Sequence, residues 1–165
     1  MLKKITFRKI FLQLFILILV VSAVRWYQQR HLVDGIAPII SGQLVDGRNW
    51  SMSDYRGEPV LLYFWGIWCG ICQMQSGTID AIAKDHHVLS IAMDSGSKAD
   101  VLRYMQVQSR SFPVMMDSNL SAAYGVGVVP TYFIIDKEGK INFTEVGYST
   151  SIGLRLRLWL TRWLS

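Results

Sequence analysis

Cysteine, histidine and charged side chains are scarce in this chain of 165 residues. Two cysteines allow at most one disulfide, so a small domain stapled by several bridges is excluded. Of the three histidines, His86 and His87 are adjacent and lack the gap usual between paired zinc ligands, so we expect no metal site. Charged residues make up 18% of the chain and hydrophobic residues 51%, which excludes a disordered chain and is typical of one folded domain with a short appendage.

Acidic residues are absent from the first 30 positions, and this changes the meaning of the net charge of +5. Those positions hold six basic residues, whereas residues 31–165 hold 11 basic and 12 acidic ones and are nearly neutral. A protein that binds nucleic acid through its phosphates needs a concentrated basic surface on its folded part. We therefore expect no nucleic-acid partner. Arg155, Arg157 and Arg162 form one local basic cluster, which is typical of a solvated helix face.

A long hydrophobic run lies near the amino terminus, over residues 10–24, with Gln13 and Ser22 as its only polar side chains. Its length falls between the apolar part of a signal peptide and a transmembrane helix. Residues 21–23 resemble a cleavage site, but no polar break follows, so we favour an uncleaved anchor that spans about residues 10–27. Four Lys or Arg residues precede the run, which predicts a cytoplasmic amino terminus. The rest of the chain is then expected outside the cytoplasmic membrane, where disulfides persist.

Beyond the anchor region, residues 1–30, we expect a linker at 31–38 and one domain at 39–165. Asp46-Gly47 predicts an early hairpin between residues 39–45 and 48–52. Continuous apolar runs predict two strands buried on both faces, with a helix between them that ends near Lys84. The expected elements are strands at 60–65, 88–93, 114–116, 131–135 and 141–146, and helices at 97–108, 119–124 and 151–164. Strands separated by helices predict an α/β fold with a parallel core, and the last two strands add an antiparallel edge.

A Cys-x-x-Cys motif joins the strand predicted at residues 60–65 to the helix after it. Cys69 is expected at the positive end of that helix, where free N–H groups favour a thiolate. Cys72, one turn deeper, is expected to attack the mixed disulfide between Cys69 and a substrate and to release the product. The motif therefore predicts a redox pair with Cys69 as nucleophile and Cys72 as resolving thiol. An inert pair and half of a zinc site are the alternatives.

Residues 60–72 resemble the active-site strand and motif of the thioredoxin superfamily. With the early hairpin and the turn at 53–57, they resemble its membrane-anchored TlpA-like branch. Segments 111–114, 125–131 and 148–159 resemble the suppressor of copper sensitivity protein D (ScsD) type of protein disulfide oxidoreductase. The resemblance implies a thioredoxin-like fold, with a central mixed β-sheet flanked by helices, an amino-terminal β-hairpin and a membrane helix.

The resemblance also implies roles for single residues. Pro130 is expected to be a cis-proline beside the cysteines, and the backbone of Val129 is expected to pair with an extended substrate segment. Trp68 is expected either to cover the disulfide or only to pack. Gly70 and Ile71, between the cysteines, are expected to tune the redox potential.

The chain departs from the family where proton-accepting groups are concerned. Thioredoxins have a buried Asp six residues before the first cysteine, where this chain has Tyr63, and several TlpA-like reductases have a Glu three residues after the second cysteine, where it has Gln75. A buried carboxylate can accept the proton of the resolving thiol, so its absence argues against an efficient reductase. Gly77 stands where the family often has a proline that kinks the helix.

Together these features predict a membrane-anchored periplasmic thiol-disulfide oxidoreductase, single-pass in the bacterial inner membrane, whose C-terminal domain acts on exported proteins and exchanges electrons with a membrane redox partner. No organic cofactor or metal is implied, because the cysteine pair itself stores the electrons. Two alternatives stay open, a copper(I)-handling module that uses the same cysteines and a tethered reductant dedicated to one partner, as in cytochrome c maturation. The sequence leaves the direction of the reaction open.

Overall fold

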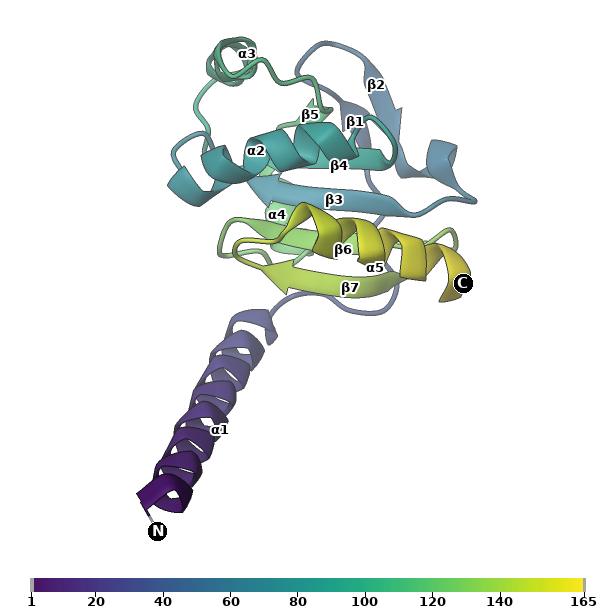
Figure 1. Ribbon diagram of the computed structural model, residues 1–165. Coiled ribbons are helices and arrows are strands. Elements are labelled where there is room, and N and C mark those ends of the chain that lie inside the picture. The colour runs from purple at the N-terminus through teal and green to yellow at the C-terminus, as the bar shows by residue number, and fades with distance from the viewer. Residues whose placement is uncertain (1, 165) are drawn as a thin grey trace. The chain divides into compact units, whose positions relative to one another are not determined.

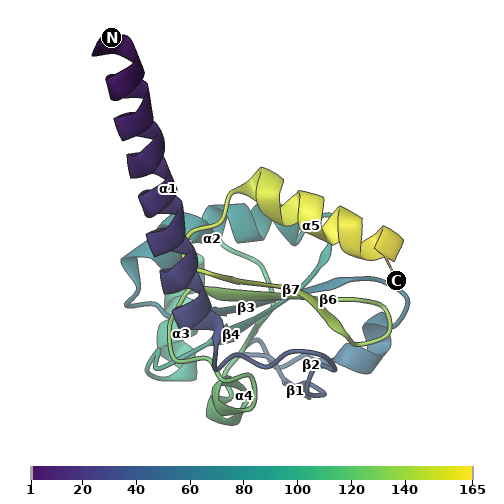
Figure 2. The same ribbon diagram turned by 90° about the horizontal axis from the view of Figure 1, so that it is seen from below.

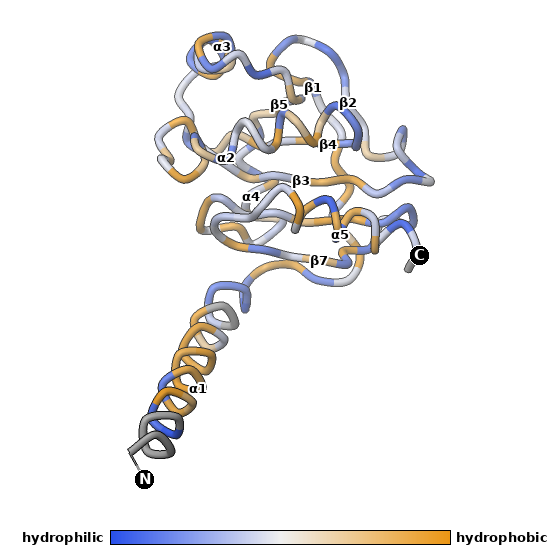
Figure 3. The backbone as a smooth tube through the Cα atoms, viewed as in Figure 1, coloured by the Kyte–Doolittle hydropathy of each residue, from blue (hydrophilic) through white to orange (hydrophobic). Residues whose placement is uncertain are grey.

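The computed structural model describes residues 2–164, and the chain forms two compact units, Met1–His31 and Leu32–Ser165. The first unit consists of the helix α1 (Leu2–Gln29). Its segment Arg8–Gln29 has 22 residues, and the most apolar 18-residue stretch within it has a mean hydropathy of 2.1. The middle of this segment is orange in Figure 3. At about 1.5 Å per residue this segment covers about 33 Å, enough for the hydrocarbon core of a bilayer. A signal sequence near the amino terminus shares these properties.

The second unit is built on a five-stranded sheet in the order β5-β4-β3-β6-β7 (Figure 1). β3 pairs with β4, and β4 with β5, in parallel, whereas β6 and β7 run antiparallel to their neighbours. This mixed arrangement confirms the predicted α/β architecture. The strands are β3 (Val60–Trp65), β4 (His87–Ala92), β5 (Val114–Met115), β6 (Thr131–Ile135) and β7 (Ile141–Val146).

Helices cover both faces of the sheet, because β3 is apolar along its whole length and all six of its side chains are buried. One face packs against α2 (Gly70–Ile82), α3 (Lys98–Val107) and α5 (Ser151–Leu164). The other face packs against α4 (Ser118–Ala123) and the hairpin of β1 (Ser41–Gln43) and β2 (Asn49–Ser51). Figure 2 shows α5 and α4 on opposite sides of the sheet. Alternate residues of β3 therefore enter different cores, Tyr63 the one under α2 and Phe64 the one under α4.

The amino-terminal hairpin turns at Asp46-Gly47, as predicted. Gly47 has a φ of +91°, which glycine adopts without steric cost. Asp46 accepts hydrogen bonds from the backbone nitrogen and Nε of Arg48, at 3.0 and 2.8 Å, and the side-chain bond is the main cause of the lowered pKa of Asp46. The strands are shorter than the predicted ranges, and Leu44 instead bridges Met115 of β5.

Local capping explains where α3 begins. The Ser97 side chain accepts from the backbone nitrogen of Asp100 at 3.2 Å, and the Asp100 carboxylate accepts from the backbone nitrogen of Ser97 at 2.9 Å. This is a capping box with Asp in place of the usual Glu or Gln. A short 3-10 helix, Met52–Tyr55, forms where a turn or a single helical turn was expected at 53–57. The helix α2 ends at Ile82, two residues before the predicted end.

The segment expected to be a linker makes contacts with the folded domain. The backbone nitrogen of Val33 donates to the carbonyl of Tyr124 at 3.2 Å, and that of Ala37 donates to the carbonyl of Gly139 at 2.8 Å. Ala37 is buried, with 4% of its surface exposed. Residues 32–38 of the expected linker therefore belong to the same compact unit as the sheet.

Candidate active site

The two cysteines lie at the junction between β3 and α2, and they form a disulfide. Cys69 is the N-cap of α2, and its sulfur accepts from the backbone nitrogen of Cys72 at 3.2 Å. An N-cap acceptor satisfies one of the free N–H groups that begin a helix, and those groups favour negative charge. In the reduced protein the same position would stabilise a Cys69 thiolate, which is what nucleophilic attack requires.

The two sulfurs differ in access. Cys69 has 8% of its surface exposed, whereas Cys72 is fully buried in the core under α2. A substrate disulfide can therefore approach Cys69 but not Cys72. This asymmetry fits the predicted order, in which Cys69 attacks first and Cys72 resolves.

A second loop lies beside Cys69. The peptide bond between Val129 and Pro130 is cis, as the resemblance implies, and the carbonyl oxygen of Val129 lies 3.9 Å from the Cys69 sulfur. The hydroxyl of Thr131 donates to the carbonyl of Val128 at 2.7 Å, which fixes the loop. Residues 60 positions apart in the chain thus meet at the disulfide.

A sequence profile of the AhpC/TSA family matches residues 33–144, more than half of the chain. The chain belongs to the AhpC/TSA family. It is similar to a thioredoxin-like protein of Haemophilus influenzae, with 31% identity over 151 residues that cover 89% of this chain and 90% of the relative. It is also similar to the thiol-disulfide oxidoreductase ResA of Geobacillus thermodenitrificans, with 32% identity over 120 residues that cover 69% of each protein.

Solved structures also resemble this chain. The exposed lipoprotein thioredoxin Etrx1 of Streptococcus pneumoniae is 31% identical, with a TM-score of 0.69 over 74% of this chain and 99% of that one. These comparisons confirm the thioredoxin-like fold of this AhpC/TSA protein and are consistent with the TlpA-like branch. They do not single out the ScsD type.

Trp68 packs against Gly66 and the end of β4. Its indole nitrogen donates to the carbonyl of Met93 at 3.2 Å, and 59% of the residue stays exposed. A Cβ on Gly66 would lie 2.6 Å from the indole nitrogen, so the glycine makes room for the ring. The residue that precedes Cys69 thus holds its ring against Gly66 and Met93 and leaves an exposed apolar surface.

Tyr63 and Gln75, which stand where the resemblance would place carboxylates, are both fully buried. Gln75 is fully buried, and its amide nitrogen donates to the carbonyl of Ser149, in the loop between β7 and α5. The hydroxyl of Tyr63 lies 3.5 Å from the carbonyl oxygen of Cys72, at the outer limit of a hydrogen bond. Burial raises the pKa of Tyr63 well above its usual value, so this phenol stays protonated. Sequence reasoning singled out Gln75 and Tyr63 but missed Ser149, because 74 residues separate the two partners.

Six exposed apolar side chains lie on three segments that the contacts above connect to the active site, and we name them the apolar rim. One segment carries the cysteines, one holds Val129, and one is bonded to Gln75 through Ser149. Exposed apolar residues next to a reactive group are typical of a protein-binding surface. The apolar rim consists of Trp68, Ile71, Met74, Val128, Tyr148 and Ile152. Gly70, the first residue of α2, has open space around its Cα.

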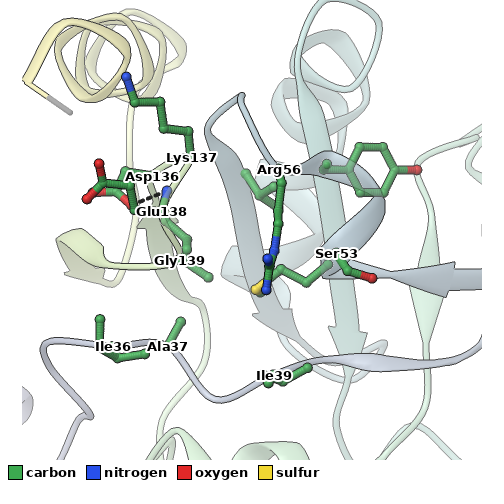
Figure 4. Close-up of a pocket in the computed structure, with 13 residues that line it drawn as sticks. Ile36, Ala37, Ile39, Ser53, Arg56, Asp136, Lys137, Glu138 and Gly139 are labelled. Atoms are coloured by element: carbon green, nitrogen blue, oxygen red, sulfur yellow. Dashed lines mark hydrogen bonds between the residues drawn. The ribbon is translucent and has the colours of Figure 1, made fainter.

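A cavity of about 240 Å³ lies away from the cysteines. It is lined by Val60, the first residue of β3, and Ile135, the last of β6, so it opens at the end of the sheet opposite Trp65 and Cys69. At its rim the Asp136 carboxylate accepts from the backbone nitrogen of Glu138 at 2.9 Å (Figure 4). Within residues 2–164 no cluster of three or more His, Cys, Asp or Glu side chains is arranged to hold a metal ion.

Proposed function

We propose that this chain is a membrane-anchored thiol-disulfide oxidoreductase that exchanges disulfides with exported proteins through Cys69 and Cys72. The observation that carries the proposal is the disulfide at the start of α2, with one sulfur accessible and the other fully buried. The thioredoxin-like fold and the similarity to ResA support the same chemistry.

The reaction follows from the two environments. The Cys69 thiolate attacks one sulfur of a substrate disulfide, a bond forms between the two sulfurs, and the other substrate sulfur leaves as a thiolate. Cys72 then loses its proton and attacks the Cys69 sulfur, which closes the intramolecular disulfide and expels the second substrate thiolate. Two electrons have passed to the substrate. The reverse sequence, starting from the closed disulfide, oxidises a dithiol substrate.

The surroundings of Cys69 suit an extended polypeptide. The backbone of Val129 lies beside the sulfur, where a peptide can add as a short strand. The apolar rim offers contact for side chains on either side of a substrate cysteine. A protein substrate, rather than a small thiol, is therefore the expected partner.

The apolar stretch of α1 supports a membrane attachment with the domain outside the cytoplasm. In that compartment a disulfide in the resting protein is stable. A membrane protein that returns electrons to, or removes them from, the pair completes the cycle.

The direction depends on a potential that ranges from about −270 to about −120 mV among thioredoxin-like proteins. Neither a dedicated reductant nor an oxidant is favoured by a contact among the described residues. Equilibration of the Cys69-Cys72 pair with glutathione buffers gives this potential directly.

The test of the function is insulin reduction by the full chain in detergent, with dithiothreitol as the electron source. We expect activity above the dithiothreitol background that Cys69→Ala abolishes and that Cys72→Ala reduces while it accumulates a mixed disulfide. If the Cys69→Ala protein exchanges disulfides as fast as the unmodified chain, the proposal is wrong. Tight copper(I) binding without thiol exchange would instead favour the copper-handling alternative.

A further inference from the structure

The helix α5 has two apolar faces, and only one of them packs against the sheet. Leu154 and Leu158 fill the inner face and are buried in the core under α2. The outer face carries a second row of large apolar side chains, each between 53% and 81% exposed. Packing against the sheet does not explain this second row. We name it the outer stripe of α5, and it consists of Ile152, Leu156, Trp159 and Trp163.

The outer stripe follows the repeat of a helix. Its members are four, three and four residues apart, which places them along one side of α5. The rings of Trp159 and Trp163 are neighbours, with centroids 6.1 Å apart. A single exposed apolar residue is ordinary on a protein surface, whereas a continuous row is typical of an interaction site. The outer stripe therefore calls for a partner.

The composition of α5 fits the surface of a lipid bilayer. Residues 151–164 contain three arginines and no acidic residue. Arg155 pairs with Asp85 at 2.9 Å, but the side chain of Arg162 is 68% exposed and its ion pair with Glu58 is long, at 4.0 Å. The guanidinium of Arg162 is therefore available to a lipid phosphate. Tryptophans on an apolar helix face, with arginines beside them, are typical of helices that lie in the membrane interface.

The segment after α1 keeps the domain at the bilayer that α1 is proposed to span. α1 ends at Gln29, and the backbone nitrogen of Val33 bonds the carbonyl of Tyr124 in the folded domain. Four residues reach at most about 14 Å, so a chain anchored by α1 holds its domain at the membrane surface. A binding face on a tethered domain meets the bilayer at a high effective concentration. This step rests on the membrane attachment in the proposed function.

The segment that follows α1 and the helix α5 both lie beside β7, an edge strand of the sheet. The backbone nitrogen of Ile141, the first residue of β7, donates to the carbonyl of Gly35 at 2.8 Å. α5 lies over β6 and β7 (Figure 1), and Arg157 of α5 pairs with Glu145 of β7 at 2.6 Å. A bilayer at this edge of the sheet can therefore contact α5 without a longer tether.

A second copy of the chain fits the outer stripe less well. If each side chain of the stripe buried about 150 Å², the low end for an aromatic ring, two stripes together would bury about 1,200 Å², the lower edge of the range for stable interfaces. Two copies of α5 would also bring arginines together, because the helix has no acidic residue to pair with Arg155 or Arg162.

We propose that the outer stripe of α5 binds the surface of the lipid bilayer, with Trp159 and Trp163 among the headgroups and Arg162 beside lipid phosphates. α5 begins two residues after Ser149, whose backbone is bonded to α2. The contact thus holds the start of α5, and the loop bonded to the helix of the cysteines, close to the membrane. The membrane redox partner of the proposed function would meet the domain at this surface.

The test locates tryptophan side chains relative to lipid headgroups. The full chain, with fluorotryptophan at its six tryptophan positions, is reconstituted into nanodiscs of phosphatidylethanolamine and phosphatidylglycerol. Substituting one tryptophan at a time by phenylalanine assigns the fluorine NMR signals. Lipids with a nitroxide on the headgroup are then included, and the loss of each signal by paramagnetic broadening is measured. We expect strong loss for Trp159 and Trp163 and little loss for the buried Trp50.

Three controls make the test specific. Trp68 is 59% exposed, so it reports chance collisions of lipid with an exposed ring, and its signal should lose less than those of Trp159 and Trp163. Leu156→Glu places a charge in the middle of the outer stripe and should restore both signals. Val107→Glu is the matched variant, because Val107 is 74% exposed on α3, and it should restore neither. Equal midpoints of thermal unfolding show that both variants are folded.

The outcomes separate the possible partners of the outer stripe. Signals of Trp159 and Trp163 that stay sharp beside the nitroxide lipids overturn the bilayer contact, as does an equal loss for Trp68. Sharp signals together with a dimer that Leu156→Glu abolishes would assign the outer stripe to a second copy. If the chain does not elute with the nanodiscs at all, the membrane attachment in the proposed function fails, and the bilayer contact fails with it.

Discussion

Both ends of the Gln75 side-chain amide bond the backbone of Ser149. The amide nitrogen donates to the Ser149 carbonyl, and the amide oxygen accepts from the Ser149 nitrogen at 3.4 Å. The pair ties α2, three residues after the resolving cysteine, to the loop that carries Tyr148. A carboxylate cannot make this double contact, since it has no donor.

Gln75→Glu should therefore destabilise the protein by about 1–3 kcal/mol near neutral pH, the cost of leaving a buried carbonyl without its donor. Burial should raise the pKa of the new carboxyl above its unfolded value, because the protonated form alone restores the donor. The loss of stability should then be smallest below the unfolded pKa and should grow as the pH rises through the folded pKa. Urea unfolding of variant and unmodified chain between acid and neutral pH measures this loss of stability.

Gln106→Glu provides the control for this substitution, because Gln106 lies exposed on α3. The same chemical change there should alter the free energy of unfolding by less than about 0.5 kcal/mol. Equal effects at both positions would contradict a specific role for the contact with Ser149.

Gly66→Ala should displace the Trp68 ring. The added Cβ would lie 2.6 Å from the indole nitrogen and 3.1 Å from the Met93 carbonyl, so either the ring or the backbone has to shift. We expect a destabilisation of about 1–3 kcal/mol and loss of the indole bond to Met93, seen as an upfield shift of the Trp68 indole proton in NMR spectra.

Gly127→Ala is the comparison for that glycine, because a Cβ there meets nothing within 4 Å and its φ is not in the left-handed region. Its stability should match or exceed that of the unmodified chain. An unshifted Trp68 indole signal in Gly66→Ala would show that the ring does not depend on this glycine.

Ser97→Ala should cost about 0.5–2 kcal/mol, because it removes the N-cap of α3. The bond to the Ser97 side chain is the main cause of the lowered pKa of Asp100, whose ordinary value is 3.8. A lowered pKa stabilises the fold above the unfolded value and loses this effect as the pH falls through the folded value. The difference between variant and unmodified chain should thus shrink as the pH falls through the folded pKa of Asp100.

Ser118→Ala tests whether the effect belongs to the cap, since Ser118 is an exposed first residue of α4 whose N-cap is Asp117. Thermal unfolding of both variants at two pH values measures the loss of stability and its pH dependence. A pH-independent loss in Ser97→Ala would exclude a contribution from Asp100.

The orientation of the anchor gives a prediction in cells. A C-terminal fusion to alkaline phosphatase, which is active only where disulfides form, should be active when residues 1–30 are present. Changing the four basic residues before the apolar run to acidic ones should lower that activity by weakening the topology signal. A fusion that is inactive with residues 1–30 intact would place the domain in the cytoplasm.

Sequence patterns predicted those elements that local composition determines. The apolar run of β3, the ranges of β6 and β7 and the whole of α5 match the structure residue for residue. The hairpin strands are shorter than predicted, and Leu44 pairs with Met115 of β5 instead. Pairing between segments far apart in the chain cannot be predicted from a short stretch of sequence.

Only part of the candidate site could be predicted, because some of its contacts join segments that are far apart in the sequence. The spacing of Cys69 and Cys72 identified them as a redox pair, and the cis bond before Pro130 was predicted from the resemblance. The contacts of Tyr63 with Cys72 and with Tyr132 depend on how two strands, β3 and β6, and the helix α2 pack together, so the sequence marked Tyr63 only as a missing carboxylate.

The most direct test is the pH dependence of Cys69 alkylation in the reduced full chain, with Cys72 replaced by serine. A sulfur at the start of α2 should titrate below the ordinary thiol pKa of about 8.5, at about 7.5 or lower. If the alkylation rate instead follows a pKa of about 8.5 or above, the helix does not activate this cysteine, and the proposed chemistry is contradicted.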